Sequence, residues 1–300
     1  MPNFPEYVDS TILAAYKSCP HKFMTEFLQH WKPKEPSVHL HAGASFAAGL
    51  EAARHAFWDR EEPREEAEAI GLQALLIHYG DFECPPDSAK SAERTAGAFE
   101  FYMSHYPLGE DGATPVKLAT GKYAIEFSFA EPLGVLHPET GNPILYVGRL
   151  DQVSKFADGI FIQDEKTTTS LGQNWAKQWD LRSQFTGYHW GLDKAAGIRA
   201  NGALVRGVSI LKTKYETIPA LTYRAPWQIE EWVHVTEDCV GDIVRRWKLG
   251  YYPKVLDHAC TDYGGCMFRQ VCLSPDPAPW LSQYFERREW NPLTREEKRL

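Results

Sequence analysis

Several features of membrane and secreted proteins are absent from this chain of 300 residues. No stretch reaches the roughly 18 consecutive apolar residues that a membrane-spanning helix needs, so we expect no membrane partner. The start of the chain lacks a basic segment followed by an apolar run, so we expect no secretory leader and a reducing, cytoplasmic location. Disulfide bonds are therefore not expected, although the chain has six cysteines. Internal repeats and low-complexity tracts are also missing. With 43% hydrophobic and 13% aromatic residues the chain can bury a large core, which agrees with one compact enzyme.

Positive charge is scarce, with 32 Lys and Arg against 40 Asp and Glu and a formal net charge of −8. This balance at first argues against a nucleic-acid partner, because binding to the phosphate backbone depends on lysine and arginine. The sum hides a local basic cluster, formed by Arg149, Lys166, Lys177 and Arg182. A basic cleft on an acidic body would reconcile the two observations, although each such cluster could also be a solvated face.

The most informative segment covers residues 148–167, which read as two strands joined by a short turn. Side chains on a strand alternate between its faces, so Asp164 and Lys166 share one face of the second strand. If the two strands are neighbours in a hairpin, Asp151 on the first strand can face the same place. Two carboxylates and one ammonium would then meet at the end of an apolar sheet.

This set of side chains suits the hydrolysis of a phosphodiester. Mg²⁺ binds oxygen ligands and keeps several waters, so two carboxylates such as Asp151 and Asp164 suffice to hold it. The Glu165 backbone carbonyl could join them, while Lys166 could position the attacking water or neutralise developing charge. A surface ladder of salt bridges would use the same residue types and would stabilise little. The flanking residues are apolar, however, and charge is costly there unless it has a function.

The two strands resemble the motif of the PD-(D/E)XK nucleases of the RecB type, in which an Asp precedes a turn and Asp-x-Lys follows. The resemblance implies a metal-dependent deoxyribonuclease that uses Mg²⁺ or Mn²⁺. It gives the catalytic residues as Asp151, Asp164, Glu165 and Lys166, of which the two aspartates bind the metal.

A helix after these strands carries the Gln-x-x-x-Tyr pattern of the same nucleases, here Gln184 and Tyr188. Residues four apart lie on one helix face. The resemblance implies that this face covers the active site and contacts the DNA backbone or the shell around the metal. Without the preceding motif, a Gln and a Tyr at this spacing would more simply form a half-buried helix face.

Three cysteines near the end of the chain, Cys260, Cys266 and Cys272, are clustered, which in a reducing compartment indicates a metal site or chance. With Cys19 they resemble the ligands of iron-sulfur nucleases of the same class, such as the CRISPR-associated adaptation nuclease and the AddB nuclease domain. The resemblance implies a structural 4Fe-4S cluster. Five residues separate Cys260 from Cys266 where many relatives have two, so His258 is an alternative ligand. Zn²⁺ is the alternative metal, although the Cys-x2–4-Cys pairs of structural zinc sites are absent.

One departure from the family concerns an extra metal ligand. Relatives often carry a histidine on an early helix within a Gly-x-x-x-His pattern, and the matching segment here, Gly43 to Ala47, ends in alanine. Glu51 lies one helical turn further on the same face and could replace the histidine as a metal ligand. A structural or solvent-facing glutamate would fit the position as well. The missing histidine puts a two-metal mechanism in question, because the second ion needs another ligand.

The pattern of apolar residues predicts an α/β fold. Helices are expected over 10–30, 41–60, 62–79, 88–106, from 174, and over 226–250, and strands over 122–129, 144–153, 159–167 and 203–212. This order suits a mixed central sheet flanked by helices, and the resemblance implies a PD-(D/E)XK core of the restriction-endonuclease type. We expect residues 1–300 to form a single nuclease domain with a helical N-terminal part (1–115), a nuclease core (116–222) and a C-terminal part (223–300) that holds a helix, the cysteines and an extended strap (274–279).

We predict a metal-dependent DNA nuclease, with exonuclease action on DNA ends or single strands favoured. Its pathway could be recombination, repair, phage replication or CRISPR adaptation, with protein partners from such a system. A catalytically weak DNA-binding or scaffold subunit that keeps the fold and the metal cluster is the alternative, and Ala47 favours it.

Overall fold

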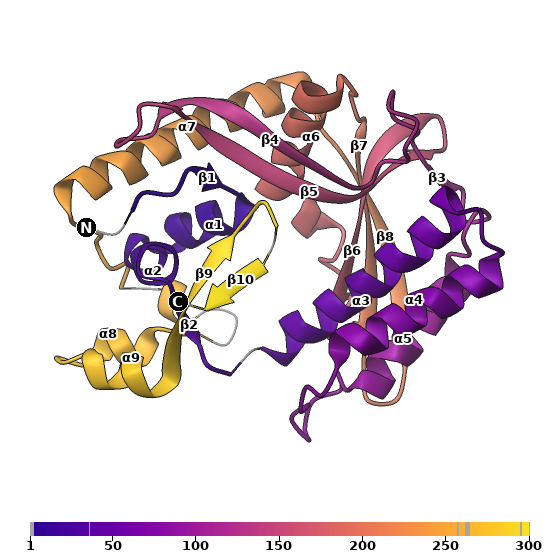
Figure 1. Cartoon of the computed structure of the whole chain (residues 1–300), viewed down its shortest axis with the longest axis horizontal. Coiled ribbons are helices and arrows are strands. Elements are labelled where there is room, and N and C mark those ends of the chain that lie inside the picture. Colours follow the sequence, from indigo (N-terminus) through magenta and orange to yellow (C-terminus); the bar gives the residue numbers. More distant parts are fainter. Residues whose placement is uncertain (1–2, 36, 257, 262–264, 295, 300) are drawn as a thin grey trace. The chain divides into compact units, whose positions relative to one another are not determined.

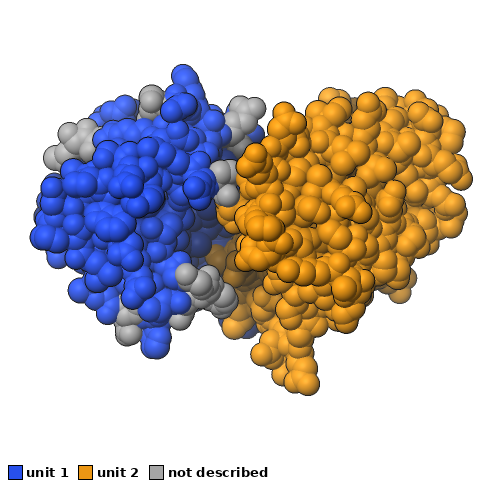
Figure 2. Space-filling view, turned by 90° about the horizontal axis from the view of Figure 1, so that it is seen from below, with its two compact units in different colours: residues 1–35, 129–148, 227–300 blue, residues 36–128, 149–226 orange. Residues whose placement is uncertain are grey.

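The computed structural model of the chain describes residues 3–35, 37–256, 258–261, 265–294 and 296–299 (Figure 1). The chain forms two compact units. Unit 1 comprises residues 1–35, 129–148 and 227–300, and unit 2 comprises residues 36–128 and 149–226 (Figure 2). None of the helices in the described ranges is both long and apolar enough to cross a membrane.

The sheet of unit 2 contains the strands on which the expected catalytic residues lie. Strand β5 (Pro143–Phe156), which begins in unit 1, forms an antiparallel hairpin with β6 (Gly159–Thr168). β7 (Gly202–Ile210) pairs parallel with β6, and β8 (Tyr215–Tyr223) pairs antiparallel with β7. The short strand β3 (Ala113–Pro115) pairs antiparallel with β5. The sheet is therefore mixed, as the sequence predicts.

Three helices of unit 2 pack together on one face of this sheet: α3 (Val38–Arg54), α4 (Arg64–Tyr79) and α5 (Ala92–His105) (Figure 1). Their apolar side chains form a core with β7, in which Phe99 and Val208 are fully buried. A π-helical turn extends α3 to Asp59. Helix α6 (Ser183–Ala196) contacts β6, and glycine ends it in a left-handed conformation.

Unit 1 holds all the cysteines except Cys84, together with the long helix α7 (Pro226–Leu249), whose first residue belongs to unit 2. Its N-terminal elements are β1 (Tyr7–Val8), α1 (Ser10–Ser18), α2 (Pro20–Phe23) and a π-helical turn (Met24–Leu28). β1 runs parallel to β5, and β4 (Ile125–Leu136) also pairs with β5. A three-stranded antiparallel sheet has the order β10 (Glu296–Arg299), β9 (Phe285–Asn291), β2 (Trp31–Pro33). Short helices α8 (Arg269–Leu273) and α9 (Ala278–Tyr284) precede β9.

The prediction of a continuous helix over 10–30 was wrong, because Pro20 interrupts it. Proline has no N–H to donate, and it disfavours the helical conformation of the residue before it. Cys19 is accordingly extended, with φ −163° and ψ 115°. The chain resumes as a second short helix, so Cys19 lies in a break between two helices.

Two further expectations also differ from the structure. The helix expected from 174 begins at Ser183, and the segment before it contains only turns and a 3-10 helix at Lys177–Trp179. The extended strap was expected over 274–279, but α9 begins at Ala278, so the last two of these residues are helical. Strands β8, β9 and β10 were not predicted, because their charged residues and prolines weaken the alternating pattern on which strand prediction depends.

The buried His189 on α6 should make the stability of the fold depend on pH. His189 is only 2% exposed. Burial lowers the pKa of His189 from 6.5 to about 4, and Arg224 adds a smaller effect in the same direction. Between these values the unfolded chain takes up a proton that the folded chain refuses, so the stabilisation present above pH 6.5 is lost as the pH falls to 4. The free energy of unfolding should fall by roughly 3 kcal/mol more in the wild type than in His189→Gln.

Urea denaturation between pH 4 and pH 7 measures this difference. His105→Gln, at an exposed position on α5, is the control and should keep the wild-type slope. If the free energy of unfolding depends on pH equally in His189→Gln and the wild type, the lowered pKa of His189 is contradicted.

Candidate active site

The β5–β6 hairpin brings Asp151, Asp164 and Lys166 together. Gln152 lies opposite Gln163, so the same register places Asp151 opposite Asp164. Lys166 Nζ lies 2.6 Å from Asp164 Oδ1, and Asp151 Oδ2 lies 3.4 Å from the Glu165 backbone nitrogen, which donates to it. The charge of Asp151 also acts on the pKa of both Asp164 and Lys166. The structure thus places the three side chains in one site.

Asp164 is the most deeply buried of the three, at 1% exposure. The pKa of Asp164 is raised to about 7, chiefly by burial and also by the charge of Asp151, although Lys166 opposes both. Burial alone would lower the pKa of Lys166, but Asp164, Asp151 and Tyr188 together outweigh burial and raise it. Two carboxylates and one ammonium leave the site one positive charge short, so a divalent cation bound by both aspartates would stabilise their ionised forms. The two aspartates therefore offer the oxygen ligands that a divalent cation such as Mg²⁺ or Mn²⁺ prefers.

Glu165 points away from this site, to the opposite face of β6. Its carboxylate accepts hydrogen bonds from Arg54 at 2.6 Å, Tyr102 at 2.7 Å and Gln163 at 2.8 Å. Although burial alone would raise it, the pKa of Glu165 is lowered to about 2, chiefly by the Arg54 guanidinium with help from Arg206. The side chain is thereby engaged in a buried ion pair, and only the Glu165 backbone remains near the aspartates.

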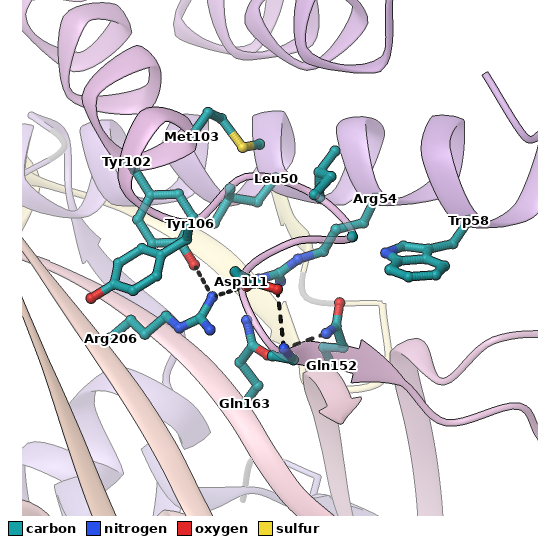
Figure 3. Close-up of a pocket in the computed structure, with 13 residues that line it drawn as sticks. Leu50, Arg54, Trp58, Tyr102, Met103, Tyr106, Asp111, Gln152, Gln163 and Arg206 are labelled. Atoms are coloured by element: carbon teal, nitrogen blue, oxygen red, sulfur yellow. Dashed lines mark hydrogen bonds and ion pairs between the residues drawn. The ribbon is translucent and has the colours of Figure 1, made fainter. Parts of the chain in front are cut away.

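The buried ion pair belongs to a wider network around a small pocket (Figure 3). Arg206 points toward Tyr102 and Asp111, with distances of 3.2 Å and 2.5 Å. Its guanidinium carbon also lies 4.1 Å from the centre of the Tyr106 ring, which is close enough for a cation–π contact. The network ties α3, α5 and β7 to the strand that carries Asp164 and Lys166.

The residues of the Gln-x-x-x-Tyr pattern lie on the Asp164 side of the sheet. Gln184 Nε2 donates to Tyr188 Oη at 2.9 Å, and Tyr188 is 3% exposed. Tyr188 also acts on the pKa of Lys166, which places α6 beside that lysine. The structure therefore brings both residues to the candidate site.

Sequence reasoning missed Trp175, which covers the sheet next to Lys166. Gly207 on β7 lies opposite Lys166, and a Cβ at this glycine would come within 2.3 Å of the Trp175 ring. Only glycine allows the indole to approach so closely. A glycine inside a buried strand is the signal that could have indicated this contact.

Helix α3 places Ala47 and Glu51 near the same strands. Ala47 is exposed, and Gly43, one turn earlier, packs close to Thr167 at the end of β6. The Glu51 carboxylate accepts a hydrogen bond from Arg149 at 2.9 Å. Glu51 thus forms an ion pair with an arginine that sequence reasoning placed only in a general basic cluster.

The four cysteines of the expected cluster gather in unit 1. The Val255 backbone connects two of them, because its N–H donates to Cys19 Sγ and its carbonyl accepts from Cys260, both at 3.4 Å. Burial raises the pKa of Cys266 and of Cys272, and Cys19 and Cys260 raise both further. The thiols are therefore electrostatic neighbours, although they come from opposite ends of the chain. Within the described part of the chain, no three His, Cys, Asp or Glu side chains are grouped closely enough to hold a metal ion.

Comparison with known proteins identifies the family. A model of the PD-(D/E)XK nuclease superfamily matches residues 10–273, and the chain belongs to this superfamily. The predicted superfamily and its α/β fold are thus confirmed. No curated protein matches the chain.

The fold is also found among solved structures. The crystal structure of a protein named as a putative exonuclease, from Eubacterium rectale, is 14% identical to the chain. The match covers 86% of this chain and 88% of that one, with a TM-score of 0.51. At this identity the likeness concerns the fold alone. The crystal structure of SSO0001, also 14% identical, matches over 65% of this chain and 74% of that one with a TM-score of 0.28, from which nothing follows.

The buried ion pair predicts a large loss of stability on changing Glu165. Glu165→Gln leaves the Arg54 guanidinium buried without a counter-charge, which typically costs about 3 to 5 kcal/mol. The control is Glu110→Gln, since Glu110 forms a 2.6 Å ion pair with Arg64 but is 69% exposed, where such pairs contribute about 0 to 1 kcal/mol. Urea denaturation at pH 7 measures both changes. Equal effects of the two substitutions would show that the Arg54 pair has no special weight.

Proposed function

We propose that this protein is a metal-dependent deoxyribonuclease that hydrolyses phosphodiester bonds at the site formed by Asp151, Asp164 and Lys166. One observation carries the proposal: the buried carboxylate of Asp164 faces Asp151 and is neutralised only in part, by Lys166 at 2.6 Å. A further cation would balance the charge of this site, and the bound cation would in turn bind a phosphate oxygen of the substrate. Membership of a nuclease superfamily supports the same conclusion.

Each residue has a separate task in this proposal. Asp151 and Asp164 would hold Mg²⁺ or Mn²⁺, with the Glu165 backbone carbonyl as a third oxygen ligand. When bound, the cation would polarise the phosphoryl oxygen and lower the pKa of a coordinated water. Lys166 would orient the attacking water or neutralise charge that develops on the phosphate.

The helix α6 would contribute to substrate binding. Gln184 and Tyr188, hydrogen-bonded to each other at 2.9 Å, would contact the DNA backbone beside Lys166. Trp175 packs closely against Gly207, the residue of β7 that lies opposite Lys166.

We favour exonuclease action on DNA ends or single strands over internal cleavage. The RecB-type motif supports this choice, and a structure with the same fold carries an exonuclease name. Recombination, repair, phage replication and CRISPR adaptation, with their protein partners, are the pathways in which such an activity is needed. A catalytically weak DNA-binding or scaffold subunit is the second candidate, supported by the alanine at position 47.

We also propose a structural 4Fe-4S cluster held by Cys19, Cys260, Cys266 and Cys272, with Zn²⁺ as the alternative. The mutual electrostatic effects of these thiols support it, and all six cysteines are free, which suits a reducing, cytoplasmic location. Strands β4 and β5 run through both units, which supports a single nuclease domain over residues 1–300.

The first prediction concerns cleavage. Asp151→Asn, Asp164→Asn and Lys166→Ala should each lower the rate at least about 10²- to 10³-fold, because each removes a preorganised electrostatic partner, while DNA binding persists. Digestion of end-labelled single- and double-stranded DNA with Mg²⁺, Mn²⁺ or chelator measures the rate. Asp158→Asn, in the exposed turn of the same hairpin, is the control and should cleave normally. If Asp164→Asn cleaves within about tenfold of the wild-type rate, Asp164 is not a catalytic residue. If the wild type is inactive, the scaffold alternative is favoured.

The second prediction concerns the thiols. Anaerobically purified protein should be brown and contain about four irons per chain, as the cluster type requires. Cys→Ser at any of the four positions should remove the colour, whereas Cys84→Ser and Cys239→Ser should not. Iron analysis and absorption spectra measure this contrast. A colourless protein with one zinc would refute the iron-sulfur cluster and leave the nuclease proposal standing.

A further inference from the structure

Arg149 is held by two carboxylates. It lies on β5 two residues before Asp151. Glu51 of α3 accepts from its Nη2 at 2.9 Å, and Glu126 at the start of β4 forms an ion pair with its Nε. The arginine side chain is 25% exposed. The Arg149 guanidinium is therefore fixed in position by two carboxylates and is still reached by solvent.

The backbone of Glu126 is strained where it meets this arginine. Its φ is +51°, in the left-handed region that residues other than glycine rarely adopt. Such a conformation costs on the order of 1 to 3 kcal/mol and persists only where surrounding structure enforces it. The Glu126 side chain is only 11% exposed in its ion pair. The strain thus coincides with a contact that fixes the position of Arg149.

The proposed reaction requires positive charge near the phosphate, and a fixed arginine can supply it. In phosphodiester hydrolysis, negative charge builds up on the non-bridging oxygens, and a second metal ion often stabilises it. Here the position expected for an extra metal ligand is Ala47, and Glu51, one turn further, binds Arg149 instead. A guanidinium stays protonated at all working pH values and matches a phosphate with two parallel N–H donors.

We propose that Arg149 is a further catalytic residue, whose guanidinium contacts the scissile phosphate and takes the place of a second metal ion. The proposal rests on the nuclease function proposed above. A water oxygen bonds to phosphorus, the bond from phosphorus to the leaving sugar oxygen breaks, one water proton passes to solvent, and the leaving oxygen takes up a proton. Arg149 exchanges no proton in these steps and only balances charge on the phosphate.

The test compares Arg149→Gln and Arg149→Lys with Arg64→Gln. Arg64 is a matched control, because it also belongs to unit 2 and forms a 2.6 Å ion pair with a glutamate. Three quantities are measured: the single-turnover cleavage rate at saturating DNA with Mn²⁺, the salt dependence of DNA affinity in Ca²⁺, and Mn²⁺ binding by calorimetry without DNA. Thermal unfolding shows whether each variant is folded.

Arg149→Gln should lower the cleavage rate about 10²- to 10³-fold. Its slope of log affinity against log salt should fall by roughly 0.7 to 0.9, the value of one phosphate contact. Arg149→Lys should recover most of the slope but little of the rate, because an ammonium lacks the planar pair of donors. Mn²⁺ binding should be no weaker in Arg149→Gln or in Glu51→Gln, and Arg64→Gln should match the wild type throughout.

Several results would overturn the inference. If Arg149→Gln cleaves within about tenfold of the wild type while Asp164→Asn is inactive, the inference fails and the nuclease function stands. Weaker Mn²⁺ binding in Glu51→Gln would make Glu51 a metal ligand and would likewise contradict it. If the wild type cleaves nothing, the nuclease proposal fails, and an unchanged salt slope for Arg149→Gln would then show that Arg149 does not contact phosphate either.

Discussion

The candidate active site depends on a single register between β5 and β6. Because side chains alternate, a slip of one residue would place Glu165 where Asp164 lies and would bury Asp164 and Lys166 on the other face. Buried polar side chains hold the register: Gln163 Oε1 accepts from Ser154 at 2.7 Å and from Gln152 at 3.2 Å. These hydrogen bonds lie inside the protein, where an unpaired polar atom is costly, so a slipped pairing would be strongly disfavoured.

The two faces of this hairpin differ in how their charges are balanced. On the face that α3 and α5 cover, two guanidiniums, of Arg54 and Arg206, meet two carboxylates, of Glu165 and Asp111. On the other face, Asp151 and Asp164 meet the ammonium of Lys166, and the pKa of Asp164 rises to about 7. The charges of the first face are balanced within the protein, whereas the second face is one positive charge short. The same strand therefore combines a rigid support with a site that is ready for a ligand.

The sequence was sufficient to predict the mixed sheet and the convergence of Asp151, Asp164 and Lys166. That prediction used only alternation on strands and a short hairpin, which are local properties. The partners of Glu165 could not be predicted, because Arg54 and Tyr102 lie 111 and 63 positions away on two helices. The ion pair that Glu51 forms with Arg149 was hidden for the same reason, since it joins positions 98 apart. The alternation of residues along a strand predicts which face of the sheet a charged side chain lies on. Its partners come from distant parts of the chain and are known only from the folded structure.

The division of the chain has a consequence for its synthesis. Unit 1 is assembled from three separate segments, and unit 2 is made between the first and the last of them. Residues 1–35 must therefore wait for α7 and the C-terminal cysteines, which at common rates of translation takes roughly 10 to 50 s. During this interval Cys19 is in a nascent segment without its later neighbours, while most of unit 2 has already emerged from the ribosome. Residues 227–300 thus complete a unit whose first segment is made before all of unit 2.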